Sequence, residues 1–308
     1  MTGRTVGPEH GWTGAEPLDR IEVDGIRAWG RHGVLEQEKQ LGQEFVADIV
    51  LHVATAPAGR TDALARTVNY AEAAAAVQEE LLAGPHDLVE TLAERIAQRL
   101  LTDTGAPLVR RVGVTVHKPA APVGLPVADV RVRIERDAPP IEAVLALGTN
   151  LGDREDHLRA ALALLEATAG IEVEWTSPVH ETAPVGGPSG QGAFLNAVVG
   201  VRTVLSPFTL LEVAHRAERA AHRERLVRWG PRTLDVDVIA YGAFTSEDEE
   251  LTLPHPRAHE RAFVLAPWHD ARPEAELPGH GPIAALLAAA PDREGLRVGP
   301  AIPGFGRP

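Results

Sequence analysis

Polar and apolar residues alternate along four stretches of the first 136 residues, a pattern typical of strands with one buried face. The stretches are DRIEVDGIRAWG (19–30), QEFVADIVLHVAT (43–55), RRVGVTVHKP (110–119) and ADVRVRIER (128–136). In the second stretch every odd-numbered residue from Phe45 to Val53 is apolar. Side chains alternate between the two faces of a strand, so these residues share one face. We therefore predict four strands that each turn one face to a core.

Two helices are predicted between the second and third strands. Asn69, with Glu72 three residues later, is a typical helix start, and the apolar run that follows ends at Gly84 and Pro85. The next helix is predicted to start near Asp87, and its apolar residues recur every four positions from Leu88 to Leu100. The order ββααββ predicts an α+β domain with an antiparallel sheet and helices on one face.

The second half of the chain begins a new pattern after DAPPIE (137–142), where adjacent prolines interrupt regular structure. Strands are predicted at 143–147, 171–177, 193–203 and 233–241, and helices at 154–168, from Ser206 and Pro207 onward, and around 261–268. This is a second α+β domain. We predict a disordered tail at 1–18, a first domain at 19–136, a linker at 137–141 and a second domain at 142–308.

Composition excludes several classes of protein. The chain has no cysteine, so disulfides, iron–sulfur clusters, thiolate zinc sites and a cysteine nucleophile are absent. Its net charge of −13 makes it a poor general binder of nucleic acid. The first 18 residues hold no apolar signal region, and no stretch approaches the length of about 20 apolar residues that spans a bilayer. We expect a soluble, cytoplasmic protein.

Two carboxylates interrupt an otherwise apolar strand in TLDVDVIAY. Asp235 and Asp237 share one face of that strand, roughly 7 Å apart along the chain. Such a pair can hold Mg²⁺, which prefers oxygen ligands and substrate phosphates. The alternative is a pair of surface aspartates bridged to nearby arginines. Six arginines precede the strand, and they can form either a solvated helix face or a phosphate-binding cluster: Arg216, Arg219, Arg223, Arg225, Arg228 and Arg232.

Four motifs between residues 142 and 269 place this pair in a wider pattern: GTNLGDR, ETAPVGG to FLNAVV, RWGPRTLDVDVI and LPHPRAHERAFVLAPW. Together they resemble the 6-hydroxymethyl-7,8-dihydropterin pyrophosphokinase family, with a ferredoxin-like α+β domain. The resemblance implies that Asp235 and Asp237 hold two Mg²⁺ ions on ATP. It implies ATP contacts by Arg223, Arg225, Arg228, Trp229, Arg232, His255 and Arg261. It implies a pterin pocket of Thr182, Val185, Phe194, Asn196 and Phe263. A zinc site at His255 and His259 is disfavoured because no third ligand is evident.

The first half carries polar residues that are unremarkable one by one. Glu36 and Glu38 stand in a turn between strands, Lys118 at a strand end, Tyr70 at a helix start and Glu90 where a capping glutamate would sit. Their motifs HGVLEQEKQLGQ, TVNYAE, ETLAERIA and VHKPAAPV jointly resemble dihydroneopterin aldolase over residues 19–136, with a tunnelling-fold-like domain. The resemblance implies an acid–base pair of Glu38 and Lys118, a site tyrosine at Tyr70, and a pterin anchor at Glu90 and the Val89 backbone.

This chemistry needs no cofactor in the first half. A dihydropterin contains a C=N bond beside its side chain, so it can serve as its own electron sink during carbon–carbon cleavage. We therefore predict a bifunctional folate-biosynthesis enzyme that cleaves 7,8-dihydroneopterin and then transfers diphosphate from ATP to the product. The alternative is a pterin- or nucleotide-binding module that has lost one of the two activities. The aldolase resemblance implies a tetramer or octamer, and no nucleic-acid or membrane partner is expected.

Overall fold

The structure is a computed structural model that describes residues 18–183, 192–221 and 233–307. The predicted tail at 1–18 lies outside these residues except for Leu18. No helix in the described ranges combines the length and the apolar character that crossing a bilayer requires.

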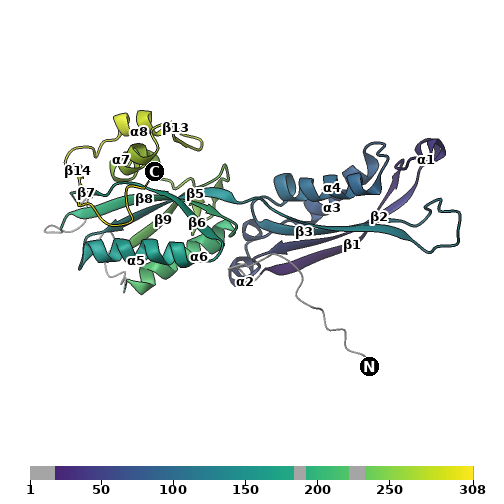
Figure 1. The fold of residues 1–308 in the computed structure, drawn as a ribbon, viewed down its shortest axis with the longest axis horizontal. Helices are drawn as coiled ribbons and strands as arrows, with labels where there is room; N and C mark the ends of the chain where they lie inside the picture. The colour runs from purple at the N-terminus through teal and green to yellow at the C-terminus, as the bar shows by residue number, and fades with distance from the viewer. Residues whose placement is uncertain (1–17, 184–191, 222–232, 308) are drawn as a thin grey trace, which may run out of the picture.

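The first domain is an antiparallel sheet in the order β1-β2-β3-β4, with α3 and α4 on one face (Figure 1). Its elements are β1 (Asp19–Gly30), α1 (Glu36–Leu41), β2 (Gln43–Val53), α2 (Ala56–Thr61), η1 (Leu64–Arg66), α3 (Tyr70–Leu82), α4 (Val89–Arg99), η2 (Leu100–Thr104), β3 (Val109–Lys118) and β4 (Val130–Asp137). The ββααββ order is confirmed. The predicted turn around Glu36 and Glu38 is wrong, because that segment forms the short helix α1.

Local sequence signals act here as expected. Along β2 the burial alternates at every residue, so Phe45 and its odd-numbered neighbours enter the core with α3 and α4. The Asn69 side chain accepts a hydrogen bond from the Ala71 amide and begins α3. The second helix starts later than predicted, at Val89, and Leu88 at its N-cap makes no side-chain capping bond.

The second domain is built around a six-stranded sheet. Its elements are β5 (Ile141–Thr149), α5 (Arg154–Ala167), β6 (Ile171–Thr176), β7 (His180–Thr182), β8 (Phe194–Thr203), α6 (Pro207–Ala220), β9 (Asp235–Tyr241), β10 (Ser246–Glu247), β11 (Thr252–Leu253), η3 (Ala258–Glu260), α7 (Ala262–Ala271), β12 (Glu276–Leu277), β13 (Gly281–Pro282), α8 (Ile283–Ala289) and β14 (Arg297–Val298).

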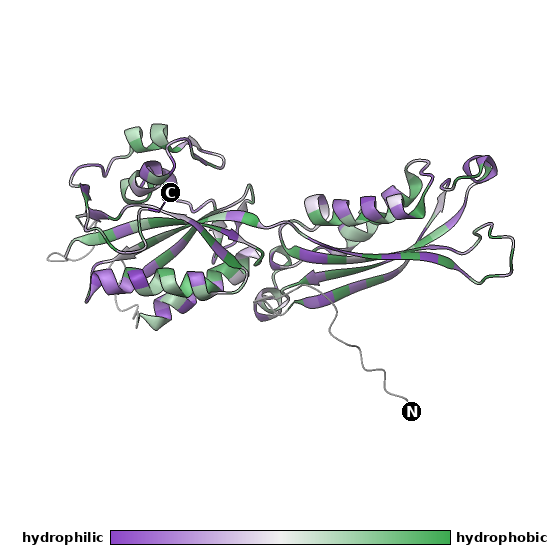
Figure 2. Cartoon of the chain, viewed as in Figure 1, coloured by the Kyte–Doolittle hydropathy of each residue, from purple (hydrophilic) through white to green (hydrophobic). Residues whose placement is uncertain are grey.

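A ferredoxin-like core runs through this domain, as predicted. The units β5, α5, β6, β8, α6 and β9 follow in βαββαβ order, and their strands lie antiparallel in the spatial order β9-β5-β8-β6. Helices α5 and α6 cover one face, while α7 and α8 cover the other (Figure 1). Because both faces are covered, the central strands are apolar along most of their length (Figure 2).

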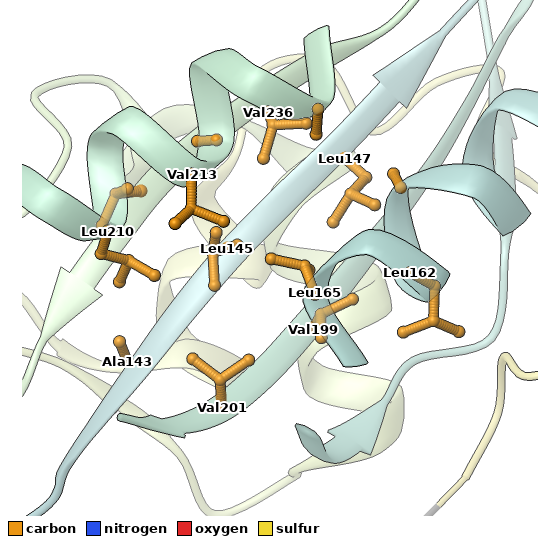
Figure 3. Close-up of a cluster of buried hydrophobic side chains, with 14 of the residues drawn as sticks. Ala143, Leu145, Leu147, Leu162, Leu165, Val199, Val201, Leu210, Val213 and Val236 are labelled. Atoms are coloured by element: carbon orange, nitrogen blue, oxygen red, sulfur yellow. The ribbon is translucent and has the colours of Figure 1, made fainter. Parts of the chain in front are cut away.

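In the core beneath α5 and α6, apolar residues two apart on a strand pack against apolar residues three or four apart on the helices. Leu145 and Leu147 of β5 pack with Leu162 and Leu165 of α5, and α6 adds Val213 to the same core (Figure 3). The Ser206 hydroxyl accepts a hydrogen bond from the Thr209 amide, and Pro207 is the first residue of α6, as the sequence predicts. β5 itself lies between β8 and β9 and pairs with both.

A histidine bridge lies on the face of the first sheet opposite α3 and α4. His117 Nδ1 lies 2.6 Å from Asp129 Oδ2, and its Nε2 lies 3.0 Å from Asp48 Oδ2. Burial favours the neutral ring, but the hydrogen bonds with Asp129 and Asp48 outweigh it and raise the pKa of His117. Asp48 also accepts the Gly25 amide and faces Arg133. The bridge therefore joins β1, β2, β3 and the loop before β4.

We expect this bridge to stabilise the fold most in mildly acidic solution. The pKa of His117 is raised above an unfolded value of about 6.5, so its contribution is complete below that pH and is lost as the pH rises through the folded pKa. The melting temperatures of the wild type and His117→Gln should differ more near pH 6 than near pH 9.

His52→Gln provides a control with the opposite sign. His52 lies on the same sheet face, and burial together with Arg20 and Arg111 lowers its pKa. A histidine with a lowered pKa costs stability at low pH, where the unfolded chain binds the proton more readily. The melting temperature of the wild type minus that of His52→Gln should therefore rise as the pH rises. A His117→Gln difference that does not depend on pH would contradict the charged bridge.

Candidate active sites

A buried ion pair lies at the end of the first sheet. Lys118 is the last residue of β3, and its Nζ lies 2.5 Å from Glu38 Oε1 on α1. Each side chain is about 9% exposed. Burial favours the protonated acid, but hydrogen bonds from Lys118, the Leu35 amide and Gln43 outweigh it and lower the pKa of Glu38. The structure thus brings together the two residues predicted to exchange protons.

Two residues around this pair escaped sequence reasoning. The Gln43 side chain donates to Glu38 Oε1 at 3.2 Å, while its own buried Oε1 has no partner among the described residues. Gly33 lies directly against Glu38, because a Cβ there would come within 2.3 Å of Glu38 Oε2. A glycine is therefore required for the carboxylate to occupy its position. The only sequence signal was proximity, since both residues flank the glutamates of the first half.

His32 lies near Lys118 and was also missed by sequence reasoning. Its ring is fully buried, its Nε2 lies 2.9 Å from the Leu81 carbonyl, and its Nδ1 accepts the His86 amide at 3.2 Å. Burial lowers the pKa of His32, and the nearby His86 and Lys118 lower it further. A neutral ring with Nε2 protonated satisfies both bonds. His32 therefore ties the loop before α1 to the segment between α3 and α4.

The predicted anchor residues lie next to this loop. Val89 and Glu90 form the first turn of α4, and Glu90 is exposed. The preceding residues are tied to the Glu38 loop, because Asp87 pairs with Lys39 at 2.6 Å and the His86 carbonyl accepts the Gly33 amide. Asp87 thus does not cap α4. Leu88 supplies no side-chain cap to α4, and the first amides of a helix have no partner within the helix.

Tyr70 is not part of the same pocket. It is 61% exposed at the first turn of α3, whereas His32 contacts the Leu81 carbonyl at the last turn. Eleven residues separate these positions, or about 16 Å along a helix. Within one chain Tyr70 therefore lies far from Lys118.

The second candidate site begins with Asp235 and Asp237. Both are half-buried on one face of β9, while Leu234, Val236 and Val238 enter the core. Across the sheet they pair with Gly148 and Ala146 of β5, whose small side chains leave room above the strand. Among the described residues no third histidine, aspartate or glutamate completes a metal cluster with them. Two carboxylates with space beside them suit Mg²⁺ held mainly by phosphate and water.

Gly148 joins the aspartates to the predicted pterin pocket. It pairs with Asp235 on one side and with Asn196 of β8 on the other, so all three share one row of the sheet. Asn196 donates from Nδ2 to Thr182 Oγ1 at 2.8 Å, and Phe194 faces the same side two residues earlier. A Cβ on Gly148 would lie 3.2 Å from Asn196 Oδ1.

The other predicted residues come from α7 and the loop before it. Phe263 packs at the edge of the core beneath α7, and the Arg261 guanidinium lies 5.9 Å from the centre of its ring. Asp292 accepts the Ala262 amide and lies 3.9 Å from Arg261. Burial and Arg257 lower the pKa of His255. His259 instead stacks on His280.

Six of the predicted residues cannot be placed. Val185, Arg223, Arg225, Arg228, Trp229 and Arg232 lie outside the described residues. Of the earlier arginines, Arg216 donates to Thr168 Oγ1 and so belongs to helix packing.

Three polar residues missed by sequence reasoning position this site. Thr149 donates to the Thr233 carbonyl at 2.6 Å and holds the approach to β9. Asn150 and Arg154 donate to the Gly192 and Ala193 carbonyls, which precede Phe194. Thr149 is the last residue of β5, Asn150 follows it, and Arg154 is the first residue of α5. All three belong to the GTNLGDR motif, in which no single residue was given a role.

The two sites lie at opposite ends of the molecule. Lys118 ends β3, whose first residues adjoin the second domain, and Gly148 lies near the far end of β5 (Figure 1). The length of β3 and of β5 up to Gly148 therefore separates them. At about 3.3 Å per residue this distance is on the order of 50 Å.

Known proteins match each domain separately. Residues 21–135 match the family model of dihydroneopterin aldolase, and residues 144–273 match that of 7,8-dihydro-6-hydroxymethylpterin-pyrophosphokinase. The 2-amino-4-hydroxy-6-hydroxymethyldihydropteridine pyrophosphokinase of Bacillus subtilis is 44% identical over 156 residues, which cover 51% of this chain and 89% of that protein.

Two further relatives cover less. The bifunctional protein FolKE of Lactococcus lactis subsp. cremoris is 42% identical over 123 residues, 40% of this chain and 35% of that protein. The solved E. coli dihydroneopterin aldolase in complex with neopterin is 29% identical, with a TM-score of 0.35, and the match covers 38% of this chain and 98% of that one.

We expect Gly148→Val to disable the second domain without unfolding it. The added side chain would press on Asn196 and fill the space beside Asp235. The activity of the second domain should fall by at least about 10-fold, because small displacements of aligned groups are costly. The activity of the first domain, measured on the same sample, should be unchanged.

Gly113→Ala serves as the matched control. It adds a side chain to another strand glycine, where the new Cβ would make ordinary contact with Val50 at 3.4 Å. Both activities should survive this change. Normal activity of the second domain in Gly148→Val would show that the row from Asn196 to Asp235 is not part of its site.

Proposed function

Because the chain belongs to the 7,8-dihydro-6-hydroxymethylpterin-pyrophosphokinase family and carries a dihydroneopterin aldolase domain ahead of it, we propose which residues perform its two reactions. The enzyme cleaves 7,8-dihydroneopterin and transfers diphosphate from ATP to the resulting 6-hydroxymethyl-7,8-dihydropterin. The observation that carries the assignment of the first reaction is the buried contact between Lys118 and Glu38.

In the aldolase reaction this pair moves two protons. One proton leaves the side-chain hydroxyl as the carbon–carbon bond breaks and glycolaldehyde forms. The electron pair passes into the C=N bond of the dihydropterin ring, and the second proton is then delivered to the side-chain carbon. Lys118 and Glu38 are within hydrogen-bond distance, so a proton can pass between them, and Gln43 holds the carboxylate in place.

The pterin ring is held by the start of α4. The Glu90 carboxylate accepts two N–H groups from the ring edge, and the Val89 backbone supplies a further contact. Support comes from the ties that hold this turn against the Glu38 loop, namely Lys39 to Asp87 and Gly33 to His86. The substrate would then lie between an anchor and an acid–base pair from two different elements.

A second copy of the chain completes the aldolase site by supplying Tyr70. The distance along α3 keeps Tyr70 away from Lys118 of its own chain, although it is exposed to a neighbour. Exposed apolar side chains also cluster around the Glu38 loop, as expected for a surface covered by another subunit: Trp29, Val34, Leu35, Leu41, Leu82 and Leu88. A tetramer or octamer would supply such a neighbour.

In the kinase reaction Asp235 and Asp237 would hold two Mg²⁺ ions, which would supply positive charge to the ATP triphosphate. When bound, the ions neutralise the charge that develops during diphosphate transfer. The nucleotide would be contacted by Arg261 and His255. The remaining predicted contacts come from Arg223, Arg225, Arg228, Trp229 and Arg232. The neutral His255 ring can donate a hydrogen bond to a phosphate oxygen.

The acceptor pterin lies beside the aspartates. Asn196 offers an amide to the ring edge, while Thr182 and Val185 line the pocket. Phe194 and Phe263 supply apolar faces on either side of the ring. The row Asn196, Gly148, Asp235 supports this arrangement. Neighbouring strands are about 4.8 Å apart, so the backbones of Asn196 and Asp235 are separated by about 10 Å.

We predict that Asp235→Asn and Asp237→Asn each abolish diphosphate transfer. Removing one charged ligand should lower AMP release by at least about 100-fold at saturating ATP. Aldolase activity on the same sample serves as the internal control and should be normal. If AMP release stays near the wild-type rate in both variants, the metal assignment is wrong.

We predict that two inactive aldolase variants restore activity when they share an oligomer. Lys118→Ala and Tyr70→Ala should each lower glycolaldehyde release by at least about 10-fold. In a co-expressed equal mixture, about a quarter of the sites receive an intact lysine from one chain and an intact tyrosine from its neighbour.

The control is a mixture of Lys118→Ala with the double variant Lys118→Ala/Tyr70→Ala, which has no intact lysine and should stay inactive. Recovery is measured as glycolaldehyde per total protein. If the first mixture recovers nothing although both chains co-assemble, Tyr70 acts within its own chain or not at all.

A further inference from the structure

A buried arginine joins the two domains at a point remote from both active ends. Arg66 of η1 is 7% exposed and donates from Nε and Nη2 to the two carboxylate oxygens of Asp248, both at 2.7 Å. Its Nη1 reaches Glu250 at 3.0 Å. The guanidinium also lies 5.5 Å from the centre of the Phe208 ring. The first domain thus inserts a side chain into a site formed by α6 and the loop between β10 and β11.

The site matches a guanidinium in charge and shape. The paired carboxylate raises the pKa of Arg66, and in return Arg66 lowers the pKa of Asp248 despite the burial of that carboxyl. The Glu250 and Leu251 amides donate to Asp248 Oδ1 and orient its carboxylate. A planar fork with two parallel hydrogen bonds and a ring contact is a geometry that lysine cannot reproduce.

A second arginine fixes the joint itself. Arg110 at the start of β3 is 1% exposed and donates to the Val204 carbonyl of the second domain and to the Pro139 carbonyl of the linker, both at 2.9 Å. The Ala138 amide donates back to the Arg110 carbonyl. Leu108 packs against the core of the second domain. Only residues 138–140 separate β4 from β5, and the contacts of Ala138 and Pro139 tie this linker to Arg110.

We propose that this interface locks the two catalytic domains into one rigid body. Each half has its own apolar core, so the short linker by itself would suggest two independent units. The buried contacts of Arg66 and Arg110 instead hold the second domain in one orientation. The two active ends then stay on the order of 50 Å apart. The aldolase product consequently reaches the kinase through solvent and not by domain motion.

Distance measurements between spin labels test the locked orientation. The chain has no cysteine, so labels can be placed on exposed positions by Gln98→Cys on α4 and Ala163→Cys on α5. Labelled chains are co-assembled with excess unlabelled chains, so that each oligomer reports one pair. The otherwise unchanged protein should give a single narrow distance distribution. Arg66→Met and Asp248→Asn should each broaden it at least twofold.

Arg60→Met is the matched control. Arg60 also pairs across the domains, with Glu212, but both side chains are more than half exposed. Exposed ion pairs contribute little, so this variant should keep the narrow distribution. Both activities are measured on every variant, because none of these residues belongs to either active site, and retained activity shows that the domains are folded.

Two results would overturn the proposal. One is a broad distribution without any interface substitution. The other is a distribution as narrow in Arg66→Met and Asp248→Asn as in Arg60→Met. The transfer of the intermediate has its own test, in which labelled dihydroneopterin is supplied with a large excess of unlabelled 6-hydroxymethyl-7,8-dihydropterin. Dilution of the label in the diphosphate product supports passage through solvent, and undiluted label contradicts it.

Discussion

The alternation of side chains across antiparallel strands is the constraint on which the rest of this structure depends. In the first domain it sends Phe45 and its partners to the helices and leaves His117 on the opposite face. In the second domain both faces are covered, and yet β9 still places Val236 and Asp237 on opposite sides. A shift of one residue would put the carboxylates of β9 into the core. Register is therefore what determines where chemistry can occur.

Both proposed active sites lie where a strand ends and this alternation stops. Lys118 is the last residue of β3, Asp235 the first of β9, and Phe194 the first of β8. At such positions a side chain is supported by the sheet and can meet residues of the adjoining loops, as Lys118 meets Glu38. The supporting bonds come from loops, as when Thr149 holds the Thr233 carbonyl. The strands thus set where the site side chains lie, and hydrogen bonds from the loops set how the adjoining segments are held.

The sequence was sufficient for most of the fold, because the relevant signals are local. Strand alternation and the caps at Asn69 and Ser206 depend on residues a few positions apart, and each appears where expected. The short helix α1 was missed because six residues are too few to display a helical period.

For the sites, Glu38 and Lys118 are 80 positions apart, and only resemblance to a family could pair them. In the structure the two side chains are in contact, and their role as an acid–base pair stays a prediction. Tyr70 matched the motif, but nothing in the sequence could show that α3 separates it from Lys118. No local sequence signal marks Arg66, since its partners come from the other domain.

The groups to which Arg110 bonds affect how the joint between the domains responds to ionic strength. Its guanidinium is buried and bonds to the carbonyl dipoles of Val204 and Pro139, which carry no net charge. Mobile ions weaken attraction between exposed charges but scarcely reach a buried contact. The chain as a whole carries a net charge of −13, so added salt also relieves repulsion between its halves. The Arg110 contact is therefore of a kind that concentrated electrolyte leaves intact, unlike the exposed ion pair of Arg60 and Glu212 across the same interface.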